Sequence, residues 1–203
     1  GKTTLLLALL GLRRPERGRV SAGEQLLFDS QRGFSLPVEE RRLAYVPQDY
    51  ALFPHLTAAE QVEFALARLP RAARLARARA LLDELGVLAA AERKPRELSG
   101  GERQRIALAR ALALEPRALL FDEPLAALDA SARGAVRDFL RDQLRALGLP
   151  AIVITHEAQD ALALADRIAV LEAGRIVQQG SFAALAAAPG TDYVASFIQS
   201  ART

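Results

Sequence analysis

The sequence begins with Gly1, Lys2, Thr3 and Thr4, which run directly into a leucine-rich segment. In a phosphate-binding loop of the pattern G-x-x-x-x-G-K-[ST], backbone N–H groups at a helix start hold phosphate groups. The lysine of such a loop reaches the terminal phosphates and the hydroxyl binds Mg²⁺. The four residues supply only the second half of this pattern. Taken alone, a polar helix start capped by threonine is the simpler interpretation.

A second group of reactive side chains lies in ALLFDEP, residues 118–124, where an apolar run ends in Asp122 and Glu123. Ligands of open α/β sheets bind at the carboxyl ends of strands. We therefore expect Asp122 to hold Mg²⁺ through a water, and Glu123 to orient and polarise a water that attacks a terminal phosphate. An ordinary acidic turn explains one carboxylate, but not the order of a GKT start, this strand and a following helix.

Between these motifs, RELSGGERQRIALARALA places Ser99, Gly100 and Gly101 just before a predicted helix. A hydroxyl, two residues that permit close backbone approach and the positive end of a helix dipole together form an anion site. Ser99 is also a good N-cap, and Glu102 completes a capping box with it. A cap by itself does not require two glycines.

The surrounding pattern predicts elements that bring these motifs together. Helices are expected over 2–12, 103–114, 133–147 and 158–165, with helical periodicity over 58–88 and two short helices at the end of the chain. Short strands are expected in 18–30, 43–48 and around Gly174, and buried strands over 117–121 and 151–155. Apolar strands that alternate with helices predict an α/β fold with a mainly parallel sheet covered on both faces, into which a helical segment is inserted.

Composition excludes several classes of protein. Hydrophobic residues make up 51% and charged residues 25% of the 203 residues, which is typical of a folded globular chain. No apolar run reaches the roughly 18 residues that a membrane-spanning helix needs. Cysteine is absent, which excludes disulfides and thiolate metal sites and favours a reducing, cytosolic setting. The net charge is only +3 and the arginines alternate with acids, so no nucleic-acid partner is expected.

Taken in order, LSGGERQR, LLFDEPLAALD and ITH resemble the nucleotide-binding subunits of ATP-binding-cassette (ABC) transporters. The resemblance covers essentially the whole chain, and LSGGE is its most specific motif. It implies a P-loop NTPase (RecA-like) core and a single ABC ATPase domain over 1–203, with the core at 1–49 and 110–203 and a helical subdomain at about 50–109.

The resemblance also implies a role for each matching residue. Lys2, Thr3 and Thr4, with Gly1, would belong to the phosphate loop, with Thr3 as a magnesium ligand. Gln48 in YVPQD is similar to the glutamine that senses magnesium and the attacking water. His156 in VITHE resembles the histidine that contacts the terminal phosphate.

Further implied roles concern a second subunit. In the family, two subunits pair head to tail, so that Ser99, Gly100 and Gly101 would bind the terminal phosphate held by the partner. Asp129 in LAALD matches the aspartate of the loop that crosses the dimer interface. Ala126 departs from the family, because many members carry serine there. The implied cofactors are ATP and Mg²⁺.

The same resemblance implies where the protein works. The segment YALFPHLTAAEQVEF follows Gln48, and we expect Phe53, Pro54 and His55 to line a groove that receives a short helix of a transmembrane permease subunit. The permease would in turn meet a solute-binding protein. The protein is accordingly expected at the cytoplasmic face of the inner (plasma) membrane, as a peripheral subunit.

Three alternatives stay open. The first concerns the solute. An importer of small solutes is favoured by the segments QDYALFPHLT and PLAALD, and a molybdate-type import ATPase by the similar segment LLFDSQRGFSLPVEERRLAYV. Sulfate, polyamine, iron or sugar remain alternative solutes. A soluble ABC protein without a transport role is a second alternative. The first half of the phosphate loop and the adenine-stacking aromatic residue are expected before Gly1, so an N-terminally truncated, inactive piece is the third.

Overall fold

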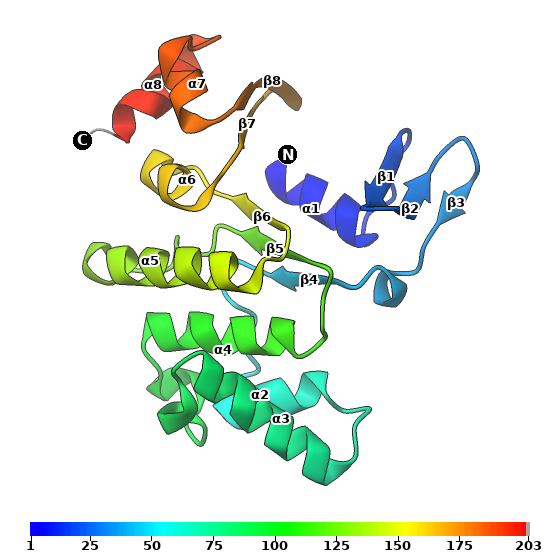
Figure 1. Cartoon of the computed structure of the whole chain (residues 1–203), viewed down its shortest axis with the longest axis vertical. Coiled ribbons are helices and arrows are strands. Elements are labelled where there is room, and N and C mark those ends of the chain that lie inside the picture. Colours follow the sequence, from blue (N-terminus) through cyan, green and yellow to red (C-terminus); the bar gives the residue numbers. More distant parts are fainter. Residues whose placement is uncertain (202–203) are drawn as a thin grey trace.

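The computed structural model describes residues 1–201, and its centre is a small parallel sheet (Figure 1). The sheet contains β4 (Leu43–Val46), β5 (Ala118–Asp122) and β6 (Ala151–Ile154), in the order β4-β5-β6. Leu43 pairs with Ala118, and Leu119 with Ala151. Because all three strands are parallel, their carboxyl ends lie along one edge of the sheet.

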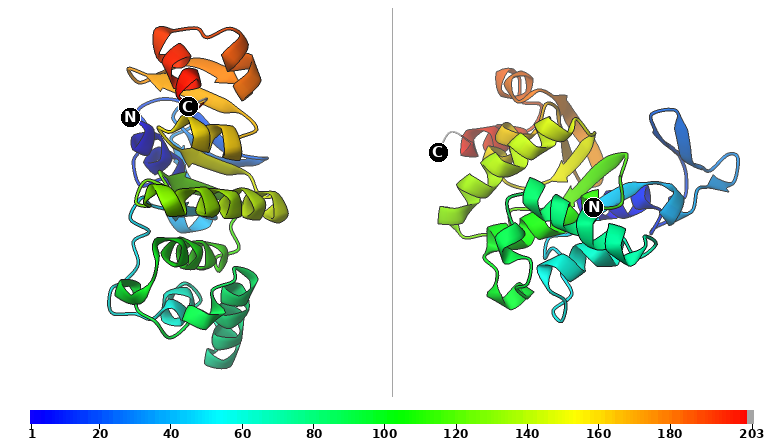
Figure 2. Two further views of the ribbon diagram at one scale, coloured as in Figure 1. Left: turned by 90° about the vertical axis from the view of Figure 1, so that its left-hand side faces the viewer. Right: turned by 60° about the horizontal axis from the view of Figure 1, so that its bottom comes forward.

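Helices cover both faces of this sheet. On one face, α1 (Lys2–Leu10) packs Leu6 and Leu10 against Leu120 of β5. On the other face, Leu119 and Phe121 join the main hydrophobic cluster with α4 (Gly100–Leu112) and α5 (Ala130–Leu147). Successive side chains of β5 therefore face opposite layers, both of which are apolar. This is why the sequence of β5 is continuously apolar and does not alternate with polar residues. The layers are visible edge-on in Figure 2.

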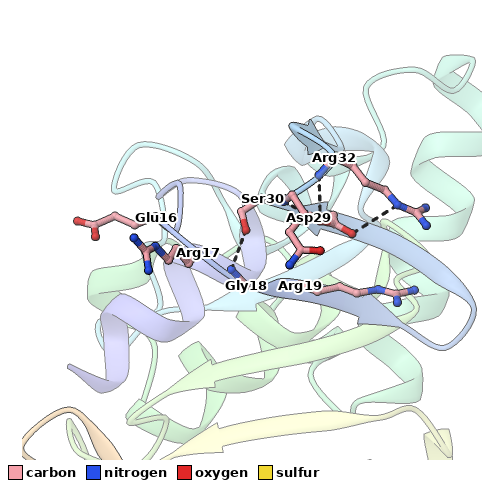
Figure 3. A pocket seen from close by; sticks show the side chains of 8 residues that line it. Glu16, Arg17, Gly18, Arg19, Asp29, Ser30 and Arg32 are labelled. Carbon is pink, nitrogen blue, oxygen red and sulfur yellow. Dashed lines mark hydrogen bonds and ion pairs between the residues drawn. The ribbon is translucent and has the colours of Figure 1, made fainter.

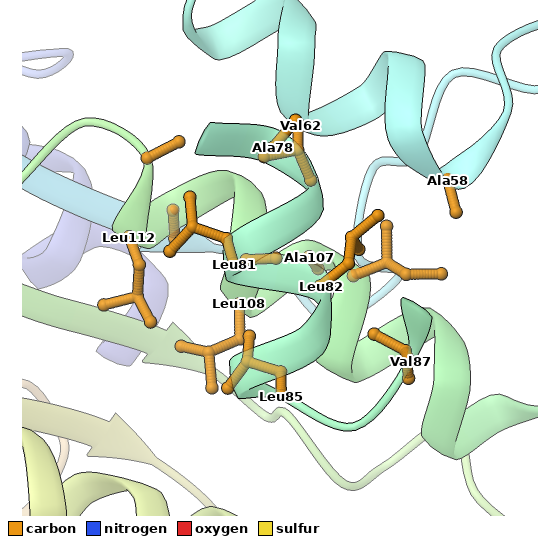
Figure 4. Packing of buried hydrophobic residues seen from close by; sticks show 14 of the residues in the cluster. Ala58, Val62, Ala78, Leu81, Leu82, Leu85, Val87, Ala107, Leu108 and Leu112 are labelled. Atoms are coloured by element: carbon orange, nitrogen blue, oxygen red, sulfur yellow. The ribbon is translucent and has the colours of Figure 1, made fainter. Parts of the chain in front are cut away.

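A helical layer lies beyond α4. It consists of α2 (Ala58–Ala65) and α3 (Arg71–Glu84), with the short 3₁₀ turns η2 (Leu88–Ala90) and η3 (Pro95–Glu97). The helical periodicity predicted over 58–88 is broken at Pro70, which is the N-cap of α3 and lacks the N–H that a continuous helix needs. Leu81 and Leu82 of α3 are fully buried against Ala107 and Leu108 of α4 (Figure 4).

The predicted division into a core at 1–49 and 110–203 and a helical subdomain at about 50–109 stays a prediction. Helix α4 crosses the predicted boundary, and residues of α2, α3, α4, β4 and β5 share one hydrophobic cluster. In this structure the helical layer and the sheet are therefore packed together through α4.

Antiparallel strands flank the parallel sheet. The ribbon β1 (Arg19–Ala22), β2 (Gln25–Asp29) and β3 (Phe34–Ser35) follows α1, and the turn η1 (Val38–Glu40) leads from it to β4. The hairpin β7 (Ile168–Glu172) and β8 (Arg175–Gly180) turns at Gly174, whose φ of 79° suits glycine. The α/β class and its parallel sheet are thus confirmed, while the other strands within residues 1–201, β1 to β3 and β7 to β8, pair antiparallel.

The C-terminal part has a core of its own. Helices α6 (Ala158–Leu164), α7 (Phe182–Ala187) and α8 (Asp192–Ser200) pack around β7, with Leu185 and Val194 fully buried. Within residues 1–201, none of the helices is long and apolar enough to cross a membrane.

A hollow of about 930 Å³ separates β6 from β7. Its apolar lining includes Leu5 of α1, Ile152 of β6 and Tyr193 of α8. The side chain of Ile152 is 44% exposed although its strand adjoins the centre of the sheet. In the described part of the chain, β6 pairs with β5 alone and β7 with β8 alone.

Candidate nucleotide site

Lys2 is the first residue of α1, and its side chain points to the end of β6. Its Nζ donates a hydrogen bond to the carbonyl oxygen of Thr155, 3.3 Å away. Gly1 is the N-cap of α1 and provides no side chain to cap it, and the first turn carries no acidic residue. The N–H groups at this positive helix end are therefore not engaged by a side chain of their own helix.

Thr3, Thr4 and Gln48 are all exposed, and no hydrogen bond of their side chains is found within residues 1–201. Gln48 follows the end of β4 by two residues, so it stands at the same sheet edge as the ends of β5 and β6. These three predicted residues are positioned near the helix start and the strand ends, with their polar groups free to meet a ligand.

Asp122 is the last residue of β5 and is buried, with 7% of its surface exposed. One of its oxygens, Oδ2, accepts a hydrogen bond from the phenol of Tyr45 on β4, at 3.2 Å. Burial, and then the charge of Asp122, raise the pKa of Tyr45 from its ordinary 10 to about 12. Tyr45 was not predicted as a site residue, because nothing in its local sequence signals this contact.

Glu123 and His156 meet where β5 and β6 end. The Oε1 of Glu123 lies 3.2 Å from Nδ1 of His156, and the imidazole Nε2 lies 3.5 Å from Oε1 of Glu157. The backbone of Glu123 has a φ of 50°, an uncommon conformation for a residue with a side chain. Its N–H donates to the carbonyl of Ile154 at 2.9 Å, which holds this turn against β6.

Ser99 caps α4 as predicted. Its Oγ accepts from the N–H of Glu102 at 3.2 Å, and Glu102 accepts from the N–H of Ser99 at 2.8 Å. Glu102 also pairs with Arg93. The hydrogen bond from the Ser99 backbone, followed by the contacts with the Ser99 hydroxyl and Arg93, lowers the pKa of Glu102 despite its partial burial.

The two glycines after Ser99 are explained in part by packing. A Cβ on Gly100 would lie 2.4 Å from Cδ2 of Leu128, and one on Gly101 would lie 3.1 Å from Cγ2 of Val136. The pair therefore allows close contact with the segment before α5 and with α5 itself. No hydrogen bond within residues 1–201 joins Ser99 to Lys2, Glu123 or His156.

Asp129 is the N-cap of α5. Its Oδ1 accepts from the N–H of Ala132 at 2.9 Å and from the hydroxyl of Ser131 at 2.5 Å. The Ser131 hydroxyl and then the backbone N–H of Ala132 lower the pKa of this exposed carboxyl. Its geometry here is that of a helix cap.

The predicted docking segment is only partly exposed. Pro54 and His55 are exposed, whereas Phe53 is half-buried and its ring centre lies 4.9 Å from that of Phe64. Tyr50, the first residue of this segment, is buried at 3% exposure and donates its hydroxyl to the carbonyl of Pro124 at 2.9 Å. The segment is thereby tied to the loop that directly follows Glu123.

Two surface hollows differ in whether predicted site residues line them. The hollow between β6 and β7 is lined by Lys2 and Thr155. A second hollow, of about 690 Å³, lies beside the β1–β2 hairpin and is lined by Arg17, Arg19 and Arg32 among others (Figure 3). None of the predicted site residues lines this second hollow, so it is separate from the candidate site.

The residue types at the site suit Mg²⁺. The hydroxyl of Thr3 and the Oδ1 of Asp122 are hard oxygen donors, and no hydrogen bond to either is found in the described part of the chain. Magnesium is usually held by one or two carboxylates, waters and substrate phosphates rather than by a protein cage. No cluster of three or more His, Cys, Asp or Glu residues suited to a metal occurs within residues 1–201.

Comparison with known proteins identifies relatives among import ATP-binding proteins. The chain is 40% identical over 190 residues to the molybdenum import ATP-binding protein ModC of Paramagnetospirillum magneticum, which covers 94% of this chain and 52% of the relative. It is 41% identical over 202 residues to the trehalose/maltose import ATP-binding protein MalK of Thermococcus litoralis, covering 98% and 54%. It is 40% identical over 198 residues to the molybdate/tungstate import ATP-binding protein WtpC of Archaeoglobus fulgidus, covering 98% and 80%.

The chain thus spans about half the length of the first two relatives and more of the third. A sequence model described as ABC transporter matches residues 1–126. That match includes the GKTT start, the SGG motif and the paired carboxylates. The chain belongs to the ABC transporter family.

Proposed function

We propose that this chain is the ATP-hydrolysing unit of an ABC importer. The observation that carries the proposal is the contact between Glu123 and His156 at the edge where Asp122 also ends its strand. Parallel strands that deliver a metal-binding carboxylate, a second carboxylate and an imidazole to one edge provide the groups that phosphoryl transfer to water requires.

In this proposal the start of α1 holds the phosphates. Gly1, Lys2, Thr3 and Thr4 contribute backbone N–H groups, an ammonium and hydroxyls at the positive end of a helix. The ammonium of Lys2 leaves the carbonyl of Thr155 and moves to the terminal phosphate. Thr3, Asp122 and Gln48 hold Mg²⁺, directly or through waters. When bound, the ion neutralises charge on the phosphate oxygens.

Glu123 is the proposed general base. Its carboxylate orients a water for attack on the terminal phosphate and accepts the proton, while His156 holds the carboxylate through Nδ1 and contacts the phosphate through Nε2. Most of the rate enhancement comes from positioning and charge stabilisation, because phosphoryl transfer needs little covalent help.

The remaining residues are assigned to a head-to-tail dimer. The N-terminus of α4 with Ser99, Gly100 and Gly101 would bind the terminal phosphate of the partner's ATP, and Asp129 would lie at the interface. The positive end of α4, which begins at Gly100 directly after the Ser99 cap, supports this assignment because it suits an anion.

For the transported solute we propose molybdate or a related oxyanion, because relatives named for molybdenum and molybdate/tungstate import align over most of the chain. Iron, sulfate or a sugar is the alternative, since relatives named for those solutes are equally similar. The partners would be transmembrane permease subunits and, through them, a solute-binding protein. The protein would then be peripheral at the cytoplasmic face of the plasma membrane. A soluble ABC protein without a transport role is the rival from another class.

Two measurements test the proposal. Purified protein should release phosphate from ATP only when Mg²⁺ is present, and a Glu123→Gln variant should bind ATP but release phosphate at least about 10²-fold more slowly. Disrupting the gene should abolish uptake of radiolabelled molybdate by cells. In cells that carry the intact gene, unlabelled tungstate should compete with the labelled molybdate for uptake. Loss of labelled sulfate or iron uptake instead would reassign the solute. Normal uptake of all of these would favour the soluble rival.

A further inference from the structure

Arg41 is the largest side chain that is fully buried, with 1% of its surface exposed. It lies between η1 and β4. Guanidinium groups are rarely buried without a carboxylate partner. No ion pair of Arg41 is found within residues 1–201, and burial lowers its pKa. A cation in this setting needs several strong acceptors to remain stable.

The acceptors come from two separate parts of the chain. Nη1 donates to the carbonyl oxygens of Ala8 and Leu9, at 3.1 and 2.6 Å, in the last turn of α1. Nε donates to the carbonyl of Leu36 at 3.0 Å, and Nη2 to the hydroxyl of Ser35 at 3.2 Å. The guanidinium thus binds the carbonyl of Leu9, shares the carbonyl of Ala8 with the N–H of Gly11, and lies at the negative end of the helix dipole.

The end of α1 is shaped to admit this group. Gly11, the C-cap of α1, has a φ of 86°, and a Cβ there would lie 2.6 Å from Cζ of Arg41. Glycine is therefore required at this position both by the backbone conformation and by the space that the guanidinium occupies.

We propose that Arg41 is a positioning residue for the nucleotide site, which fixes the phosphate-binding helix relative to the strands that carry the carboxylates. This inference rests on the proposed function. Arg41 is two residues before β4, whose Tyr45 bonds to Asp122, and the same side chain holds the far end of α1. One buried cation therefore fixes the position of Lys2 relative to Asp122, because it binds the end of the helix that carries Lys2 and lies next to the strand whose Tyr45 bonds to Asp122.

The length of α1 makes this anchor effective. Nine residues span about 13 Å, so a tilt of about 4° around the C-terminal end moves the N-terminal end by about 1 Å. A displacement of about 1 Å in a catalytic arrangement costs about 10²-fold in rate. Apart from Arg41, the contacts of α1 within residues 1–201 include the packing of Leu6, Leu9 and Leu10 and the hydrogen bond from Lys2 to Thr155.

The test compares Arg41→Gln and Arg41→Lys with two controls in the same protein. Arg41→Gln should lower kcat/KM for ATP by about 10²-fold, and KM should rise, because Lys2 and Thr3 already hold the phosphates in the ground state. Arg41→Lys should lower kcat/KM as well. An ammonium is a compact point charge and lacks the planar guanidinium that donates to several acceptors at once. Amide hydrogen exchange of Gly11 and Leu12 should become faster in both variants.

The controls separate positioning from stability. Arg42→Gln removes the neighbouring guanidinium, which donates to the carbonyl of Glu115, and should leave KM unchanged. Leu82→Ala should destabilise the helical layer without changing KM.

An unchanged KM in a folded Arg41→Lys variant overturns the proposal, and this variant decides alone if Arg41→Gln does not fold. If the unaltered protein neither binds nor hydrolyses ATP, the proposed function fails instead. The hydrogen-exchange comparison then decides whether Arg41 anchors α1.

Discussion

The phenol of Tyr45 donates a hydrogen bond to Oδ2 of Asp122 across two neighbouring parallel strands, at 3.2 Å. The contact occupies one carboxylate oxygen and leaves Oδ1 without a hydrogen-bond partner in the described chain. Tyr45 therefore fixes the orientation of the carboxylate that is proposed to hold Mg²⁺.

Replacing Tyr45 by phenylalanine should weaken metal binding. Loss of an outer partner of a metal ligand typically costs 10–100-fold in affinity, so we expect the affinity for Mn²⁺ in the presence of ATP to fall about tenfold. Electron paramagnetic resonance of Mn²⁺ measures this directly. Tyr193→Phe is the matched control, because Tyr193 is 47% exposed and lies on α8. Equal Mn²⁺ affinities for the two variants would contradict the role of Tyr45.

Glu123→Gln should separate binding from turnover. The amide keeps the shape of the side chain but cannot accept a proton, so phosphate release should fall at least about 10²-fold while ATP affinity is retained. Glu157→Gln is the control, because it removes the carboxylate that lies near Nε2 of His156, whereas Glu123 lies near Nδ1 of the same imidazole. Full phosphate release by the Glu123→Gln variant would remove the general base from the mechanism.

Gly100→Ala should destabilise the protein through a steric clash. The new Cβ would meet Leu128 at 2.4 Å, and overpacking of this kind costs about 1–3 kcal/mol. Gly134→Ala in α5 is the matched control, since nothing lies within 4 Å of its added Cβ. Alanine is favoured over glycine in a helix by about 1 kcal/mol, so that variant should be more stable than the parent. Urea unfolding measures both, and a neutral Gly100→Ala would show that the α4–α5 contact is loose.

Stability should fall in acid partly through Glu102. Its pKa is lower in the folded protein than in the unfolded chain, so its contribution is present above the unfolded value of about 4.3. The contribution is lost as pH falls through the lower folded value. Glu102→Gln should therefore destabilise the protein at neutral pH, and the difference from the parent should shrink in acid. Urea unfolding across that pH range tests this, with the exposed Glu16→Gln as control.

The parts of the fold that local sequence determines were predicted well. The apolar run of β5 and the cap at Ser99 were both recognised, because a buried strand and a capping box depend on residues close together in sequence. The predicted helix over 103–114 is found as α4, shifted toward its cap. The two-residue strand β3 was not predicted, since Phe34 and Ser35 are too few to establish a pattern.

Contacts between distant residues could not be predicted in the same way. Tyr45 and Asp122 are 77 positions apart, and Arg41 and Ala8 are 33 apart. Their pairing follows from strand order and from the packing of α1 on the sheet. The burial of Tyr50 has the same origin, because its partner Pro124 belongs to the turn after β5. The roles proposed for the predicted site residues remain to be tested by the variants above.

The hollow between β6 and β7 has a consequence for the behaviour of these 203 residues in solution. Within residues 1–201, β6 and β7 each lack a neighbour on one side, and they border an apolar lining that includes Ile152, which is 44% exposed. Unpaired strand edges of this kind are templates on which further strands add. The isolated polypeptide should consequently self-associate as its concentration rises. Its colloidal stability will depend on the hollow between β6 and β7 rather than on how tightly its main core is packed.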